Sequence, residues 1–167
     1  MIVLGLDPGT ATTGFGLIKV ENDSFSVLDF GLIETDKSQS APKRLVTIFN
    51  KLSQILRKSS PDVVSIEKLF FATNAKTAIS VGQAIGIMMY CVELHKITLF
   101  EYAPGTVKKQ ISGNGRSDKK MMQQAVRKIL GPKIRSRNHR KTHFDNSADA
   151  LAIALCHAVS IGKIKLI

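Results

Sequence analysis

The chain has 167 residues, of which 44% are hydrophobic and 22% are charged. This length suits a single domain spanning residues 1–167, and the composition is that of a globular protein rather than a disordered tail. No stretch approaches the roughly 20 apolar residues that a membrane span requires, and the start of the chain shows no basic leader or cleavage site. We therefore expect a cytoplasmic protein with no membrane partner.

Positive charge dominates the sequence. The chain carries 24 Lys and Arg against 13 Asp and Glu, which leaves a net charge of +11. A surplus of this size destabilises a compact fold unless a polyanionic partner makes use of it. Much of the surplus lies between residues 108 and 141, so one face is expected to carry the positive field and to bind nucleic acid. General solubility is the alternative explanation.

The N-terminal part predicts three strands in a meander. Residues 2–6 are a short run of β-formers that ends at a turn signal, residues 7–9. Two further β-rich runs follow near residues 14–20 and 25–34. Only Asn22-Asp23 separates them, a spacing typical of an antiparallel hairpin.

From Ala41 onward the pattern alternates between helices and strands. Apolar residues at three-and-four spacing predict an amphipathic helix that Ser60-Pro61 ends, and residues 63–66 form a buried strand that delivers Glu67. The remaining elements are a helix at 73–94, a strand at 97–102, a helix from Pro104, a glycine loop at 113–115, a helix from Asp118 to about Leu130, a polar and basic loop at 131–144, and a last helix from about Asp145 to Ser160. This order predicts an α/β fold, a mixed five-stranded sheet sandwiched by helices.

The predicted helix at 73–94 is apolar on nearly all sides and rich in small residues. Such a helix packs closely on its own sheet or serves a subunit interface. Cys91 in this helix and Cys156 in the last helix are predicted to be reduced core thiols, because both lie in apolar helical patterns.

Four acidic residues lie where a predicted strand ends or the last helix begins: Asp7, Glu67, Asp145 and Asp149. Neighbouring parallel strands are about 4.8 Å apart, so carboxylates at their ends can share a cation, and the i, i+4 spacing puts Asp145 and Asp149 on one helix face. Oxygen ligands without Cys or His favour Mg²⁺ or Mn²⁺. Two such ions about 3.5 to 4 Å apart can polarise water and stabilise the leaving oxygen of a phosphodiester.

Each of these residues also has a simpler explanation. Asp7 is a common turn residue, Glu67 could be a solvated charge after a strand, and Asp145 is a candidate N-cap. Asp149 lies inside an apolar helix, where an unpaired carboxylate is costly, so a ligand role is favoured for it. The set is stronger evidence than any one member.

Four segments carry a family resemblance: LGLDPGTATTGFG, IEKLFFATNAKTAISVGQAIG, VKKQISGNGRSDK and ADALAIAL. Together, from residue 3 to about residue 157, they resemble the RuvC family of bacterial Holliday-junction resolvases. The resemblance implies a ribonuclease-H-like fold and a homodimeric endonuclease that nicks four-way DNA junctions symmetrically. It also implies Mg²⁺ or Mn²⁺ as the metal, two ions per subunit, and a branch-migration complex of RuvA and RuvB as a partner.

The resemblance assigns Asp7, Glu67 and Asp149 to metal binding. Three residues before the last of these, where the family usually has Asp or sometimes His, this chain has Asn146. Either Asp145 takes over through a one-residue shift, or Asn146 supplies an uncharged ligand and the site is weaker. His143 is a third candidate for this position.

The resemblance also assigns contacts with DNA. Phe70 matches an aromatic residue near the junction crossover, where it can stack on an unpaired base. Lys108 and Lys119 match lysines near the scissile phosphate, where positive charge stabilises the developing anion. Arg116, in the same basic stretch, is expected to contact DNA. A core phenylalanine and ordinary exposed lysines are the alternatives, and the helix at 73–94 is expected to supply much of the dimer interface.

Two rival functions stay open. A junction-binding protein with impaired catalysis would explain Asn146 at an expected carboxylate position. Residues 7–14 also resemble the phosphate loop of actin-like ATPases and sugar kinases, although those proteins need two such domains and 167 residues leave no room for a second one.

Overall fold

The computed structural model describes residues 1–69, 75–131 and 141–166, and for residues 75–77 and 141–146 it describes the backbone alone. The described elements follow in this order: β1 Ile2–Asp7, β2 Thr12–Glu21, β3 Ser24–Glu34, α1 Ala41–Ser59, β4 Val63–Glu67, α2 Ala75–Leu94, β5 Thr98–Tyr102, α3 Pro104–Ser112, α4 Lys119–Leu130 and α5 Lys141–Ser160. No described helix is long and apolar enough to cross a bilayer.

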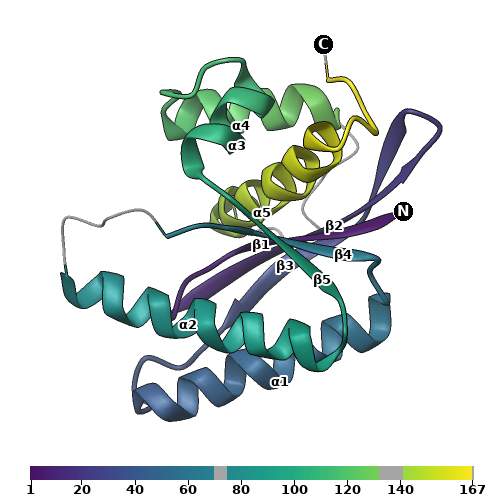
Figure 1. Ribbon diagram of the computed structural model, residues 1–167. Helices are drawn as coiled ribbons and strands as arrows, with labels where there is room; N and C mark the ends of the chain where they lie inside the picture. Colours follow the sequence, from purple (N-terminus) through teal and green to yellow (C-terminus); the bar gives the residue numbers. More distant parts are fainter. Residues whose placement is uncertain (70–74, 132–140, 167) are drawn as a thin grey trace.

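The strands form one mixed sheet in the order β3-β2-β1-β4-β5. The meander β1-β2-β3 is antiparallel, whereas β4 and β5 run parallel to β1. Figure 1 shows α1 and α2 on one face of this sheet and α5, with α3 and α4 beyond it, on the other. The predicted α/β sandwich with a mixed five-stranded sheet is confirmed.

Local sequence signals account for most of these boundaries. Asn22 and Asp23 adopt positive φ angles of 50° and 56°, as a tight hairpin between β2 and β3 requires. Helix α1 carries Pro42 in its first turn and ends at Ser60, whose φ of 42° is left-handed. Cys91 and Cys156 are buried and unpaired thiols, as predicted.

The last helix begins earlier than predicted. Helix α5 starts at Lys141, so the end of the predicted loop at 131–144 is helical and Asp145 is not the N-cap. Residues 141–145 contain neither Pro nor Gly, so nothing in them stops the helix from extending toward its N-terminus, and an acidic residue in the early turns of a helix is favourable in its own right. Residues 132–140 of that predicted loop lie outside the described residues.

A pair of glycines brings α5 directly onto the sheet. Gly5 of β1 and Gly16 of β2 are register partners. A Cβ on Gly5 would clash with the carbonyl oxygen of Ala150 and lie 2.7 Å from the Ala154 nitrogen, and one on Gly16 would lie 2.7 Å from the Leu151 nitrogen. The backbone of α5 therefore lies where side chains would otherwise stand. This close approach carries Asp149 to the end of β1.

Candidate active site

Strand alternation directs two carboxylates toward α5. Side chains two residues apart share a face of a strand, and Gly5 in β1 and Ser65 in β4 both face α5, because Gly5 meets Ala150 and the Ser65 hydroxyl donates to the Ile153 carbonyl at 3.2 Å. Asp7 and Glu67, each two residues further along, therefore point to the same face. Since β1 and β4 are parallel neighbours, both carboxylates lie at one end of the sheet.

Asp7, Glu67 and Asp149 line one pocket of about 260 Å³ at this end. Helices α3 and α4 close its other sides with Pro104, Val107, Lys108, Lys119 and Met122. The Lys119 Nζ lies 3.9 Å from Asp149 Oδ2. Residues more than 140 positions apart in the sequence thus meet, as the acidic pattern predicted.

The pocket strongly disfavours uncompensated negative charge. Burial, followed by the charges of Asp149 and Glu67, raises the pKa of Asp7 from 3.8 to about 7, although Lys119 acts in the opposite direction. Burial and Asp149 likewise raise the pKa of Glu67, against the effect of Lys108. Like charges that are held together out of water are neutralised either by protons or by a bound cation.

The donor set fits a divalent metal ion. All three acidic groups supply the hard oxygen ligands that Mg²⁺ and Mn²⁺ prefer, and their mutual repulsion is what a bound cation would relieve. In the described part of the chain, no group of three or more His, Cys, Asp or Glu side chains is already arranged as a complete ligand set. Metal binding would therefore draw the three carboxylates closer together.

The other predicted site residues are placed as follows. Lys108 and Lys119 line the acidic pocket, as expected of residues beside a reacting phosphate. Arg116 lies in the loop between α3 and α4, where its backbone N–H donates to Asn114 Oδ1 at 3.0 Å, and it is not among the residues that line the pocket. Phe70 and the side chains of His143, Asp145 and Asn146 lie outside the described residues.

Hydrogen bonds that no sequence pattern indicated hold the loop after Asp7. Thr13 donates its hydroxyl to the Gly9 carbonyl at 2.7 Å, and Thr35 donates to the Thr10 carbonyl at 2.6 Å. The Thr35 oxygen in turn accepts from Arg44 Nε of α1 at 2.9 Å. Thr35, which is only 9% exposed, therefore connects α1 to the loop that follows Asp7. Helix α1 lies on the face of the sheet opposite to the acidic pocket (Figure 1).

We expect Thr35→Val to weaken divalent-ion binding severalfold, which is less than the loss when a direct hydrogen-bond partner of a metal ligand is removed, because Thr35 acts on Asp7 only through the loop at Thr10. Valine has a similar shape but can neither donate to Thr10 nor accept from Arg44. Isothermal titration calorimetry with Mn²⁺ checks the result. Thr35→Ser should restore the affinity, and Thr47→Val, which removes an exposed hydroxyl bonded within α1, is the matched control. Equal Mn²⁺ affinity in Thr35→Val and Thr47→Val would contradict this role.

The raised pKa of Asp7 predicts a pH-dependent stability in metal-free protein. Between pH 3.8 and about 7 the folded state holds a proton on Asp7 that the unfolded state has released, so stability falls as the pH rises through this window. The free energy of unfolding in urea, measured in EDTA, should therefore decline relative to that of Asp7→Asn by a few kcal/mol and then level off. A difference between the two proteins that stays constant over the window would contradict the shift.

Comparisons with known proteins find relatives over nearly the whole chain. The model of the family described as crossover junction endodeoxyribonuclease RuvC matches residues 3–157. A protein of that name from Alkaliphilus oremlandii is 44% identical over 162 residues, which cover 95% of this chain and 93% of the relative. The structure of Thermus thermophilus RuvC matches with a TM-score of 0.82 and 30% identity over 99% of both chains. The same protein in complex with a Holliday junction substrate matches with a TM-score of 0.81 and 28% identity, again over 99% of both chains. These matches confirm the predicted ribonuclease-H-like fold.

Proposed function

The chain belongs to the RuvC family of crossover junction endodeoxyribonucleases, and on that premise we propose that it resolves Holliday junctions with Asp7, Glu67 and Asp149 as its active-site carboxylates. The family makes the chain an enzyme that hydrolyses phosphodiester bonds. The observation that carries the residue assignment is the meeting of these three carboxylates in one pocket. A match over nearly the whole chain leaves the actin-like reading without support.

Enzymes of this family depend on metal ions. Divalent ions held by Asp7, Glu67 and Asp149 would supply Lewis-acid chemistry, namely activation of a water nucleophile and stabilisation of negative charge on the leaving oxygen. The part of the chain in this reaction would be to hold those ions with Asp7, Glu67 and Asp149, and the bound cations would in turn favour the ionised forms of Asp7 and Glu67. Two ions per subunit, Mg²⁺ or Mn²⁺, are the proposed complement, and Asp145, Asn146 or His143 is the proposed source of the fourth ligand.

Lys108 and Lys119 are proposed to neutralise the phosphate during cleavage. Both line the pocket together with the carboxylates, so a phosphodiester entering it would meet ammonium groups as well as carboxylates. Each lysine already opposes the raised pKa of a carboxylate, Lys119 that of Asp7 and Lys108 that of Glu67. Both ammonium groups are therefore close enough to act on charge inside the pocket.

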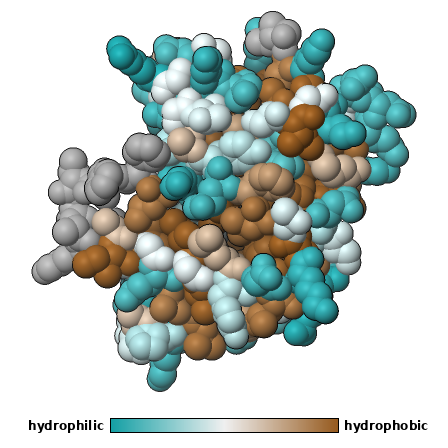
Figure 2. All heavy atoms as spheres, in the orientation of Figure 1, coloured by the Kyte–Doolittle hydropathy of each residue, from teal (hydrophilic) through white to brown (hydrophobic). Residues whose placement is uncertain are grey.

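We propose a homodimer in which two such sites face one junction. Figure 2 shows hydrophobic side chains gathered over α2 and β5, in contrast to the hydrophilic surface over α3 and α4. Exposed apolar residues of α2 and β5 form this surface: Ile79, Met89, Tyr90, Leu94 and Phe100. A soluble monomer rarely exposes a contiguous apolar patch of large side chains, so a second copy is the proposed cover. Symmetric nicking of both strands follows from such an arrangement.

The remaining contacts follow from the family. Phe70 is proposed to stack on a base at the crossover, Arg116 to contact a DNA backbone, and a branch-migration complex of RuvA and RuvB to deliver the junction in the cytoplasm. The net charge of +11 supports DNA as the partner, because phosphate contacts dominate the affinity of proteins for nucleic acid.

Cleavage of a synthetic four-way junction tests the proposed function. Purified protein with Mg²⁺ or Mn²⁺ should nick two opposite strands of the junction, and it should leave a linear duplex of the same sequence uncut. Salt-sensitive binding without any metal-dependent nicking would instead support the junction-binding protein with impaired catalysis. The feature that favours this second candidate function is Asn146, which stands where a carboxylate is expected.

A further inference from the structure

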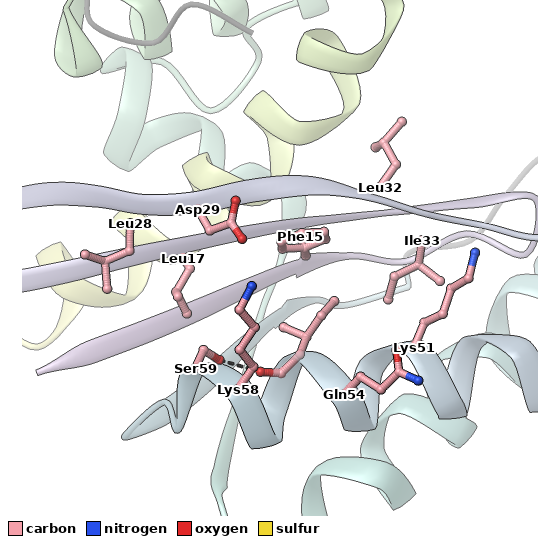
Figure 3. A pocket seen from close by; sticks show the side chains of 11 residues that line it. Phe15, Leu17, Leu28, Asp29, Leu32, Ile33, Lys51, Gln54, Lys58 and Ser59 are labelled. Carbon is pink, nitrogen blue, oxygen red and sulfur yellow. Dashed lines mark hydrogen bonds between the residues drawn. The ribbon is translucent and has the colours of Figure 1, made fainter. Parts of the chain in front are cut away.

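A second pocket of about 730 Å³ lies between α1 and the strands β2 and β3. Its floor is apolar and is formed by Phe15, Leu17, Ile33 and Ile55. Figure 3 shows Lys51 and Lys58 extending from α1 toward the strands, with Asp29 of β3 across from Lys58 and Ile33 beside Lys51. We call this pocket the α1–β3 groove. It has no lining residue in common with the acidic pocket, and it opens on the other face of the sheet.

The groove exists because β3 has few side chains that fill the space between it and α1. Gly31, the register partner of Phe15, has no side chain, and a Cβ there would lie 2.8 Å from the Phe15 ring. Phe15 therefore covers the gap but does not fill it. The register shift between Leu17 and Ile18 further displaces β3, and it leaves Leu28 45% exposed at the rim. Because β3 is an edge strand, no other strand of the sheet covers this side.

The α1 wall of the groove is cationic and rich in donors. Arg44, Lys51 and Lys58 are spaced seven residues apart and so lie on one side of the helix. Arg44 is bonded to Thr35, and Lys51 donates to the Glu34 carbonyl at 2.9 Å. Lys58 and the amide of Gln54 make no hydrogen bond or ion pair with another described residue. An occupant with carboxylates along one side and apolar groups along the other would meet this wall and this floor together.

We propose that the α1–β3 groove binds a short acidic segment of a partner protein, whose apolar side chains enter the groove and whose carboxylates pair with Lys51 and Lys58. DNA fits the same surface less well, because a phosphate backbone has no apolar side chains to cover the apolar floor, whereas a peptide does. The groove and the acidic pocket lie on opposite faces of the sheet. A partner can therefore be held while the active site is engaged, and this inference does not depend on the proposed catalytic residues.

Fluorescence anisotropy with labelled peptides tests the proposal. The probe is a short peptide in which aspartate and leucine alternate, and its companion has every leucine replaced by serine. The full-length protein should bind the leucine peptide saturably and the serine peptide at least about tenfold more weakly, since burying even one leucine contributes more than that factor. Lys51→Glu combined with Lys58→Glu should weaken binding of the leucine peptide about tenfold or more, through the loss and reversal of two ion pairs at the rim.

A matched double variant controls for net charge. Lys163→Glu with Lys165→Glu makes the same change in charge at two exposed positions of the C-terminal segment, outside the groove, and should leave peptide affinity unchanged. Leu28→Asp replaces an exposed apolar side chain of the groove, so it should weaken peptide binding while junction cleavage continues. Equal binding of the two peptides, or equal losses in the two double variants, would overturn the proposal. A groove variant that loses affinity for junction DNA and not for the peptide would identify the surface as a DNA contact and would also overturn it.

Discussion

Asp7→Asn is expected to abolish junction cleavage while leaving junction binding nearly intact. Burial, Asp149 and Glu67 raise the pKa of Asp7 to about 7, which shows how strongly the pocket disfavours uncompensated negative charge there. An amide keeps the shape of the side chain but carries no negative charge for a divalent ion. Removing an outer partner of a metal ligand already costs ten- to a hundredfold, so loss of a ligand should reduce the cleavage rate by more than about a hundredfold.

Single-turnover cleavage and a gel-shift titration in EDTA separate these two effects. Asp29→Asn is the matched control, because Asp29 lies in the α1–β3 groove and not in the acidic pocket. This control should cleave at the rate of the unaltered protein. If Asp7→Asn retained cleavage, or lost junction binding in proportion to cleavage, Asp7 would have no place in the chemistry.

Gly5→Ala is expected to destabilise the fold by about 3 kcal/mol or more, at or above the upper end of ordinary overpacking. The added methyl would clash with the Ala150 carbonyl and approach the Ala154 nitrogen, and both are backbone atoms of α5 that no rotamer change can move. The helix must shift away from β1, and Asp149 must move with it. The variant should therefore lose cleavage activity even at temperatures where it remains folded.

Urea denaturation and a cleavage assay well below the melting temperature measure the two effects of Gly5→Ala. Gly105→Ala is the matched control, since a Cβ at this position in α3 would lie 3.9 Å from the closest atom and an alanine in a helix is favourable. Its unfolding free energy should be unchanged or slightly raised. Equal stability of the two variants would contradict the close packing of the α5 backbone against Gly5.

The fold was largely predictable because its signals are local. Runs of β-formers and a turn at Asn22 and Asp23 indicated the meander, and three-and-four spacing indicated α1, which the structure confirms. The start of α5 was the main error. The predicted start of this helix depended on Asp145 as a candidate N-cap, although residues 141–144 also permit a helix.

The carboxylates of the candidate site could be predicted from the sequence, but the residues that position them could not. Asp7 and Glu67 could be paired because parallel strands bring their ends together, and Asp149 was conspicuous within an apolar helix. Thr35 and Arg44 are ordinary residues in a sequence, and only the fold shows that they are bonded to each other and to the loop after Asp7. Likewise, the need for glycine at position 5 depends on where α5 lies, which no local pattern encodes.

A crystal of this protein soaked in Mn²⁺ tests the central claim most directly. Anomalous difference density should appear between the carboxylates of Asp7, Glu67 and Asp149, with ligand distances near those typical of oxygen donors, and it should be absent from an Asp7→Asn crystal treated in the same way. Density bound elsewhere, or a pocket in which these three side chains stay apart at saturating Mn²⁺, would contradict the claim that they form a metal-dependent nuclease site.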